Sequence, residues 1–296
     1  MTFFISFFKR LYVYQRERFP VVILSISLLP AILSSGAVVG GVVSVTFVIW
    51  ALVVSVMYLL HIRIADEYRD FVHDSIHHTD RPLQRGLITL DELRYVDWCV
   101  LGVFGSVAVW LGGGFMWWGG IMIAYSWFAR YEFFLGQKLR QHFFLYNAVN
   151  LLQMLLLQVG IYLFAGAQMS AVPLLLGLHF LFTTIGTIVF EFLRKVTPPG
   201  HDGTGADTYT WFVGFSWSLM VYALFAVLQM GVFLLIGTHL AVLSLVYVGW
   251  LIVVAVPMLV SLGIAYRRPT ERVTQLLQLV YMVMYAGCNI LIFCSI

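Results

Sequence analysis

Residues 61–74 read His61-Ile-Arg-Ile-Ala-Asp66-Glu-Tyr-Arg-Asp70-Phe-Val-His-Asp74 and end an apolar run that begins near Gly41. Asp66, Asp70 and Asp74 recur every four residues, so on a helix they lie in one row that drifts about 40° around the axis per step. Aligned carboxylates repel one another, and desolvation at the end of an apolar helix adds to that cost. A cation must offset them. We expect Mg²⁺, which carboxylates and phosphate oxygens bind; the alternative is an ordinary solvated helix end, with the acids paired to Arg63 and Arg69.

The composition is that of a polytopic membrane protein of the all-α class. Hydrophobic residues make up 61% of the 296 residues and charged residues 10%, whereas soluble domains carry about 25% charge. Glycine-bearing breaks, such as those at Gly36 and Gly112, separate some of the apolar runs. We predict nine membrane-spanning helices, at residues 20–36, 42–74, 92–111, 115–135, 140–165, 171–195, 210–236, 239–264 and 272–294.

The charges are distributed asymmetrically. All 17 Lys and Arg lie at the N-terminus, around alternate connections, or in the helix ends that flank these connections. The positive-inside rule then places the N-terminus and the charged loops in the cytoplasm and the C-terminus on the opposite side. Residues 1–19 are expected to form a basic amphipathic segment on the membrane surface, with a frayed terminus as the alternative. Residues 20–296 are expected to form one membrane domain, whose chemistry happens at one membrane face.

The connection after the acid row is rich in arginine. It reads Asp80-Arg-Pro-Leu-Gln-Arg85-Gly. A guanidinium binds phosphate oxygens through two hydrogen bonds, so Arg81 and Arg85 are candidate phosphate ligands. Each of them alone also fits an ordinary positive-inside residue. Thr89 and Glu92, which follow, predict a helix start with a capping box.

Two further polar stretches lie on the same predicted side. Lys138 and Arg140, in the connection between the fourth and fifth spans, are consistent with an anion pocket and equally with interface anchors. Glu191 ends the sixth span, much as the acid row ends the second. We interpret Glu191 as a second metal ligand, with Arg194 and Lys195 as phosphate partners; the alternative is a local ion pair between Glu191 and Lys195, four residues apart.

These motifs resemble those of the UbiA superfamily of intramembrane prenyltransferases. The likeness rests on the acids four apart at the end of the second span, on the loop from Arg81-Pro82 to Gly86, and on the polar motif that ends the sixth of nine spans. It covers essentially the whole chain. The resemblance implies nine helices in a ring around a central cavity open toward lipid. It also implies a Mg²⁺–diphosphate site that caps this cavity on the cytoplasmic side.

The chain departs from the family pattern at two places. Asp66 stands where the family usually has Asn, and Glu191 to Lys195 stands where Asp-x-x-x-Asp is typical. The resemblance then implies fewer metal ions, with Lys195 or Arg194 replacing metal charge on the diphosphate. Asp202 and Asp207 could instead fold in from the loop that follows.

The sequence therefore favours a Mg²⁺-dependent enzyme that ionises a prenyl diphosphate and transfers the prenyl group to a lipophilic, possibly aromatic, acceptor. Its partners are these substrates and the bilayer, with no nucleic acid. The expected metal ligands are Asp66, Asp70, Asp74 and Glu191, and the expected diphosphate ligands are Arg81, Arg85, Arg194, Lys195, Lys138 and Arg140.

Other functions remain open. A terpene cyclase of the same superfamily would use the same site without an external acceptor. An ion-coupled transporter is disfavoured, because transporter carboxylates tend to lie near the membrane midplane and these acids lie at one end. A non-catalytic scaffold is the remaining alternative. Aromatic residues of the fourth span, such as Trp117 and Trp127, would pack the core or line the chamber.

Overall fold

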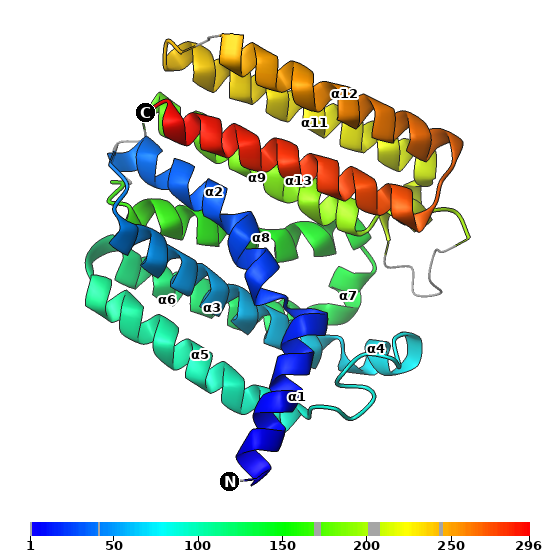
Figure 1. The fold of residues 1–296 in the computed structure, drawn as a ribbon. Coiled ribbons are helices and arrows are strands. Elements are labelled where there is room, and N and C mark those ends of the chain that lie inside the picture. The colour runs from blue at the N-terminus through cyan, green and yellow to red at the C-terminus, as the bar shows by residue number, and fades with distance from the viewer. Residues whose placement is uncertain (1, 41, 169–172, 201–207, 243–244) are drawn as a thin grey trace. The chain divides into compact units, whose positions relative to one another are not determined.

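The computed structural model describes the whole chain except residues 1, 41, 169–172, 201–207 and 243–244. The described residues form helices joined by turns and contain no strand (Figure 1). Eight of their helices are long and apolar enough to cross a bilayer. The chain is therefore an integral membrane protein of the all-α class, as its composition predicts.

The chain divides into two compact units. The first comprises Met1–Leu29 and Val45–Phe164, and the second comprises Pro30–Ser44 and Ala165–Ile296. The boundary falls inside helix α2 (Val21–Gly40), at Pro30. A proline lacks the N–H that would bond to the preceding turn, so this is a local weak point of the helix. The single membrane domain expected for residues 20–296 stays a prediction.

The first unit is built around helix α3. This helix packs against α5, α6 and α8, and α6 packs against α5 and α8 (Figure 1). The basic N-terminal segment forms helix α1, and its position on the membrane surface stays a prediction. The helices of this unit other than α2 are α1 (Thr2–Arg18), α3 (Val45–Arg69), α4 (Phe71–His77), α5 (Leu90–Leu111), α6 (Gly113–Arg130), η1 (Glu132–Phe134), α7 (Gly136–Arg140) and α8 (Phe143–Phe164).

The second unit is built around helix α9, which packs against α11 and α13, while α12 packs against α11 and α13. Buried aromatic rings fill it; those of Phe182 and Tyr285 stack with centroids 5.5 Å apart. His179 is fully buried, with its Nε2 2.9 Å from the Ser34 hydroxyl. The helices are α9 (Leu174–Arg194), α10 (Tyr209–Val213), α11 (Phe215–His239), α12 (Leu245–Arg267) and α13 (Glu271–Cys294).

Local signals in the sequence predict several helix ends correctly. Helix α5 begins with the expected capping box: the Thr89 hydroxyl accepts from the Glu92 N–H at 3.2 Å, and the Glu92 carboxylate accepts from the Thr89 N–H at 3.0 Å. It ends at Gly112, whose φ of 65° separates α5 from α6. A residue with a side chain adopts this left-handed backbone only at a cost, so glycine is the natural helix terminator here.

Two expectations about the spans need correction, and a third is not confirmed. The break near Gly36 is wrong, because α2 continues through this residue to Gly40. The second span does not run unbroken from 42 to 74: α3 ends at Arg69, and α4 begins after Asp70. The fourth span exists as α6 but is not among the eight sufficiently apolar helices, so nine crossings stay a prediction. Trp117 and Trp127 of α6 are 74% and 48% exposed, so they do not pack a core.

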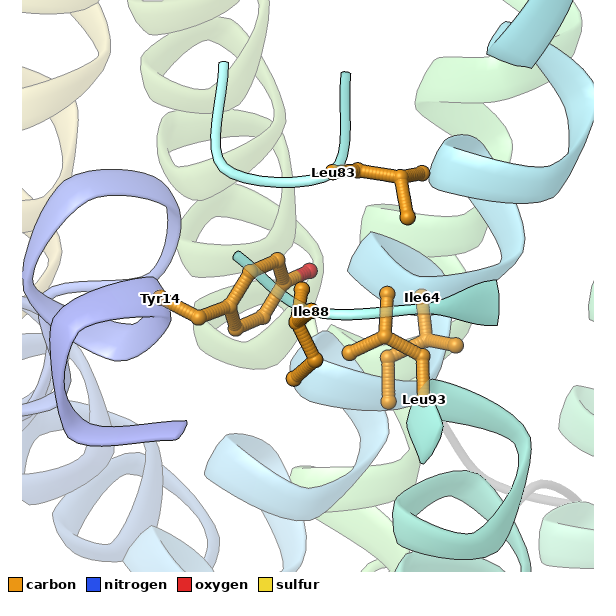
Figure 2. Close-up of a cluster of buried hydrophobic side chains, with 5 residues drawn as sticks. All are labelled: Tyr14, Ile64, Leu83, Ile88 and Leu93. Atoms are coloured by element: carbon orange, nitrogen blue, oxygen red, sulfur yellow. The ribbon is translucent and has the colours of Figure 1, made fainter. Parts of the chain in front are cut away.

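A buried apolar cluster attaches the charged 78–89 segment to the end of α3. It joins Tyr14 of α1, Ile64 of α3, Leu83 and Ile88 of the segment, and Leu93 of α5 (Figure 2). Each of these side chains is at most 6% exposed. Burial of a leucine or isoleucine side chain is worth about 1.5–3 kcal/mol. The cluster therefore holds the Arg81–Arg85 segment close to the acid row.

Candidate functional site

The three acids of the predicted row stay in register although the helix changes at Asp70. The Asp70 N–H donates to the Asp66 carbonyl, and the Asp74 N–H donates to the Asp70 carbonyl, both at 2.8 Å. The four-residue hydrogen-bond pattern therefore continues across the junction between α3 and α4. Exposure differs along the row: the side chains of Asp66 and Asp70 are 26% and 34% exposed, and that of Asp74 only 4%.

Arginines compensate the charge of the row. Arg69 lies between the first two acids, with its Nη2 2.6 Å from Asp66 and its Nε 3.3 Å from Asp70. Arg81 from the following segment binds the buried Asp74. Charge-assisted hydrogen bonds of this kind are about twice as strong as neutral ones. Pairing to Arg69, which the sequence left open as an alternative, is therefore present, whereas Arg63 binds Glu67 instead.

The donors of the row fit a hard divalent cation. Asp66 and Asp70 each offer carboxylate oxygens on a partly exposed side chain, one helical turn apart. Mg²⁺ takes oxygen ligands and is commonly bound through one or two carboxylates plus substrate phosphates. Asp74 is less suited than Asp66 and Asp70 to coordinate Mg²⁺, because its side chain is only 4% exposed and Arg81 binds its Oδ2, which leaves only Oδ1 for another partner.

Arg140 and Arg85, two of the expected phosphate ligands, are already engaged near the row. Arg140 extends from α7 to the Arg69 carbonyl at 3.4 Å and binds Glu132 at 2.6 Å. Arg85 binds Glu17 of α1 at 2.8 Å, and both partners of this pair are about 40% exposed. Lys138 is exposed on the same short helix as Arg140.

The second polar motif forms its own ion cluster in the second unit. Glu191 binds Arg194 at 2.8 Å and Lys195 at 3.1 Å. The local pairing that the sequence left open is thus present as well. Tyr209 donates its backbone N–H to the Lys195 carbonyl; burial raises the pKa of its phenol to about 12, and the Glu191 carboxylate adds to the shift. Asp202 and Asp207 lie outside the described residues, and the convergence of Glu191 with the acid row stays a prediction.

Sequence reasoning missed a carboxylate immediately beside the row. Glu67 is 1% exposed and binds Arg63 at 2.6 Å and Arg18 of α1 at 3.0 Å. The pair with Arg63 could have been found, because the two residues are four apart on one helix. The pair with Arg18 could not, because 49 residues separate the partners.

A second missed group is a buried polar chain between α3, α5 and α6. His61 Nδ1 lies 2.6 Å from Asp97 Oδ1, and His61 Nε2 lies 2.8 Å from Ser126 Oγ. All three residues are at most 5% exposed. Arg130 lies 3.9 Å from Asp97, with its guanidinium 4.0 Å from the centre of the Tyr68 ring. Polar residues inside apolar helices were the available signal, since such residues are rare and pair with one another.

Comparisons with known proteins define the fold. No family model matches the sequence, and no curated protein is significantly similar to it. Among solved structures, a UbiA homolog from Archaeoglobus fulgidus bound to GPP and Mg²⁺ matches with a TM-score of 0.61 and 13% identity, over 95% of this chain and 99% of that one. The apo UbiA homolog from Aeropyrum pernix K1 matches with a TM-score of 0.60 and 12% identity, over 90% and 96%.

A third solved structure, described as digeranylgeranylglyceryl phosphate synthase in membranes, matches with a TM-score of 0.58 and 13% identity, over 95% of this chain and 99% of that one. Together with the helices and the acid row, these matches define a class: a polytopic α-helical membrane protein with a carboxylate cluster at one helix end. More particularly, the chain has the fold of the UbiA homologues. The resemblance read from the sequence motifs is confirmed for the fold.

Proposed function

We propose that the chain is a UbiA-superfamily prenyltransferase that acts within the membrane on a prenyl diphosphate and a lipophilic acceptor. The observation that carries this proposal is the acid row, in which two partly exposed carboxylates flank Arg69 at the end of α3. The fold supports it, because the similar Archaeoglobus fulgidus homolog was solved with GPP and Mg²⁺ and again with DMAPP and Mg²⁺.

The proposed roles follow from the donors. Asp66 and Asp70 bind Mg²⁺, which when bound neutralises charge on the diphosphate. Asp74 holds Arg81 in place through their ion pair and is a weaker candidate for direct contact with Mg²⁺ than Asp66 or Asp70. Glu191 is the proposed metal ligand from the second unit. The proposed diphosphate ligands are Arg81, Arg85, Lys138, Arg140, Arg194 and Lys195.

The proposed reaction is a substitution at the allylic carbon C1, in which the acceptor replaces the diphosphate. The bond between the allylic C1 and its oxygen breaks, and the diphosphate leaves with the electron pair. Fixed cations stabilise the charge that develops on the leaving group, which is where preorganised electrostatics lowers a barrier most. The acceptor's nucleophilic atom forms a bond to C1 and loses its proton. The apolar side chains between the helices keep water away, so that the acceptor and not water captures the allylic cation.

The decisive experiment measures diphosphate release by the full-length protein in detergent or nanodiscs, with prenyl diphosphates of increasing length. Each length is assayed with Mg²⁺ or with EDTA, and with or without lipophilic acceptors, and products are identified by mass. We expect release that requires Mg²⁺ and yields a prenylated acceptor. Hydrocarbon products in the acceptor-free arm would identify a terpene cyclase instead.

A matched pair of substitutions ties this activity to the row. We expect Asp70→Asn to lower the rate on the order of 100-fold or more, because charge stabilisation at a leaving group is usually the largest catalytic contribution. Asp91→Asn is the control, since Asp91 is 75% exposed and forms a local pair with Arg94 at the start of α5. Release that resists EDTA, or that Asp70→Asn leaves intact, would contradict the proposed function.

A further inference from the structure

Three histidines lie close to Asp74 in the sequence, and two of them approach its carboxylate. His73, His77 and His78 are three of the eight histidines in the chain and fall within six consecutive residues. The His73 ring centre lies 4.6 Å from that of His77 and 6.0 Å from that of His78. One ligand atom from each of His73, Asp74 and His78 lies within 4.8 Å of the other two. Helix α4 and its C-cap residue His78 thus bring two imidazoles near a carboxylate that is 4% exposed.

The chemistry of these donors differs from that of the acid row. Imidazole nitrogen suits Zn²⁺ and other divalent transition metals, whereas Mg²⁺ prefers ligand sets made of oxygen. Two imidazoles with one carboxylate form a recurrent ligand set for such metals, with the remaining positions left to water. This set of donors therefore favours a divalent transition-metal ion such as Zn²⁺ over Mg²⁺.

One of the three pairs of ligand atoms already has nearly the spacing that such an ion requires. Bond lengths of about 2.0–2.1 Å in a tetrahedral site place ligand atoms roughly 3.4 Å apart. The Nδ1 of His73 is already 3.6 Å from Oδ1 of Asp74. The backbone is fixed on both sides of the carboxylate, because Asp74 N–H donates to Asp70 and His78 N–H donates to Asp74, both at 2.8 Å. The backbone of His78, the third ligand residue, is thus hydrogen-bonded to helix α4, which carries His73 and Asp74.

Arg81 fixes the orientation of the Asp74 carboxylate. Arg81 binds Oδ2 of Asp74, whereas Oδ1 faces His73. A ligating carboxylate is usually hydrogen-bonded through its other oxygen, which fixes its orientation toward the metal. Asp74 can therefore keep Arg81 and present Oδ1 to an ion.

We propose that His73, Asp74 and His78 form a binding site for one divalent transition-metal ion of the Zn²⁺ type. The site is distinct in its donors from the Mg²⁺–diphosphate site, but it shares Asp74 and, through it, Arg81. Occupation would therefore inhibit diphosphate turnover. Only this consequence depends on the proposed function; the binding of the ion does not.

The test is a Co²⁺ titration of the full-length protein in detergent, after removal of any polyhistidine tag. Co²⁺ bound by imidazole in a tetrahedral site gives strong visible d–d absorption. We expect saturation at one ion per chain, displacement by equimolar Zn²⁺, and resistance to a large excess of Mg²⁺. The double variant His73→Gln/His78→Gln should weaken Co²⁺ binding on the order of 100-fold, since loss of even outer-sphere partners costs 10–100-fold.

Two control variants carry substitutions at exposed histidines elsewhere, His142→Gln and His239→Gln, and both should bind Co²⁺ as the unmodified chain does. Thermal midpoints of all variants show that they are folded. Unchanged binding by the double variant, or displacement of Co²⁺ by Mg²⁺ as readily as by Zn²⁺, would overturn the proposal. Co²⁺ binding in a chain without Mg²⁺-dependent diphosphate release would refute the proposed function alone, and release without Co²⁺ binding would refute this site alone.

Discussion

At the scale of single residues, Glu67 is the acid that connects the row to the N-terminal helix. Its side chain is 1% exposed and is bound by Arg63 and Arg18. The Tyr14 hydroxyl, Arg63 Nε and Glu67 Oε2 are buried without a protein hydrogen-bond partner among the described residues. Burial raises the pKa of the Tyr14 phenol, with the Glu67 carboxylate adding to the shift, so this phenol stays neutral. Bridging water is the usual solution for such a group of polar atoms.

We expect Glu67→Gln to destabilise the protein by about 2–4 kcal/mol, because removing one partner of a buried ion pair leaves the other charge uncompensated. The matched control is Glu17→Gln, which removes an exposed pair with Arg85 and should change stability by less than about 1 kcal/mol. Thermal unfolding of the two purified variants measures the difference. Equal midpoints for both would show that the network around Glu67 contributes no stability.

The residue scale also shows what the sequence can and cannot predict about the site. Asp66, Asp70 and Arg69 lie within one helical turn of one another, so spacing alone predicts that they interact. The contact from Arg140 to the Arg69 carbonyl spans 71 residues, and the hydrogen bond between His61 and Asp97 spans 36. Helix packing makes such contacts, and one sequence holds no signal for the rotation of one helix against another.

At the scale of elements, α9 carries two glycines in contrasting surroundings. A Cβ on Gly186 would meet the Tyr285 ring and come within 2.9 Å of the Gln229 amide nitrogen, whereas a Cβ on Gly177 would meet nothing within 4 Å. Helix α9 therefore packs more closely against α11 and α13 at Gly186 than at Gly177. Alanine also gains about 1 kcal/mol over glycine from helix propensity at either site.

We therefore expect opposite effects from the same substitution on the same helix. Gly177→Ala should leave stability unchanged or raise it by up to about 1 kcal/mol. Gly186→Ala should lower it by about 1–3 kcal/mol, because the Tyr285 ring must move in a packed interior. Thermal midpoints in detergent distinguish the two. A Gly186→Ala protein as stable as the Gly177→Ala protein would show that the α9 interface is loosely packed.

Element boundaries follow the sequence where the cause is local and depart from it where the cause is tertiary. The capping box at Thr89 and the left-handed Gly112 need no distant partner, and both are confirmed. The end of α3 at Arg69 is different, since Arg140 of α7 donates to the Arg69 carbonyl there and the next helix starts immediately. Apolar patterning alone continued the span to residue 74 and could not show this change of helix.

At the scale of the whole molecule, the number of membrane crossings depends on whether α6 spans the bilayer. Eight described helices have the length and hydropathy of membrane spans, and α6 is the predicted span that is not among them. Glycine, tryptophan and tyrosine lower its mean hydropathy, although these residues are common in membrane helices and at membrane interfaces. The membrane side of every connection after α6 depends on whether α6 crosses, because one additional crossing reverses it.

Two exposed positions, one before α5 and one after α6, show whether α6 crosses the membrane. Asp80 precedes α5, and Gln141 follows α6. If both helices cross, the two positions lie on the same side; if α6 does not cross, they lie on opposite sides. Because basic residues concentrate around both connections, the positive-inside rule predicts that both are cytoplasmic.

We expect single-cysteine variants Asp80→Cys and Gln141→Cys to react with a membrane-impermeant maleimide only in inverted vesicles. The background replaces Cys99, Cys288 and Cys294, the three native cysteines. A third variant, Thr238→Cys, tests the opposite side, since five crossings including α6 separate it from Asp80, and it should react only in right-side-out vesicles. Labelling after detergent lysis controls for accessibility. Opposite sidedness of Asp80→Cys and Gln141→Cys would reduce the count to eight and place Lys138 and Arg140 across the membrane from the acid row, which would exclude them as diphosphate ligands.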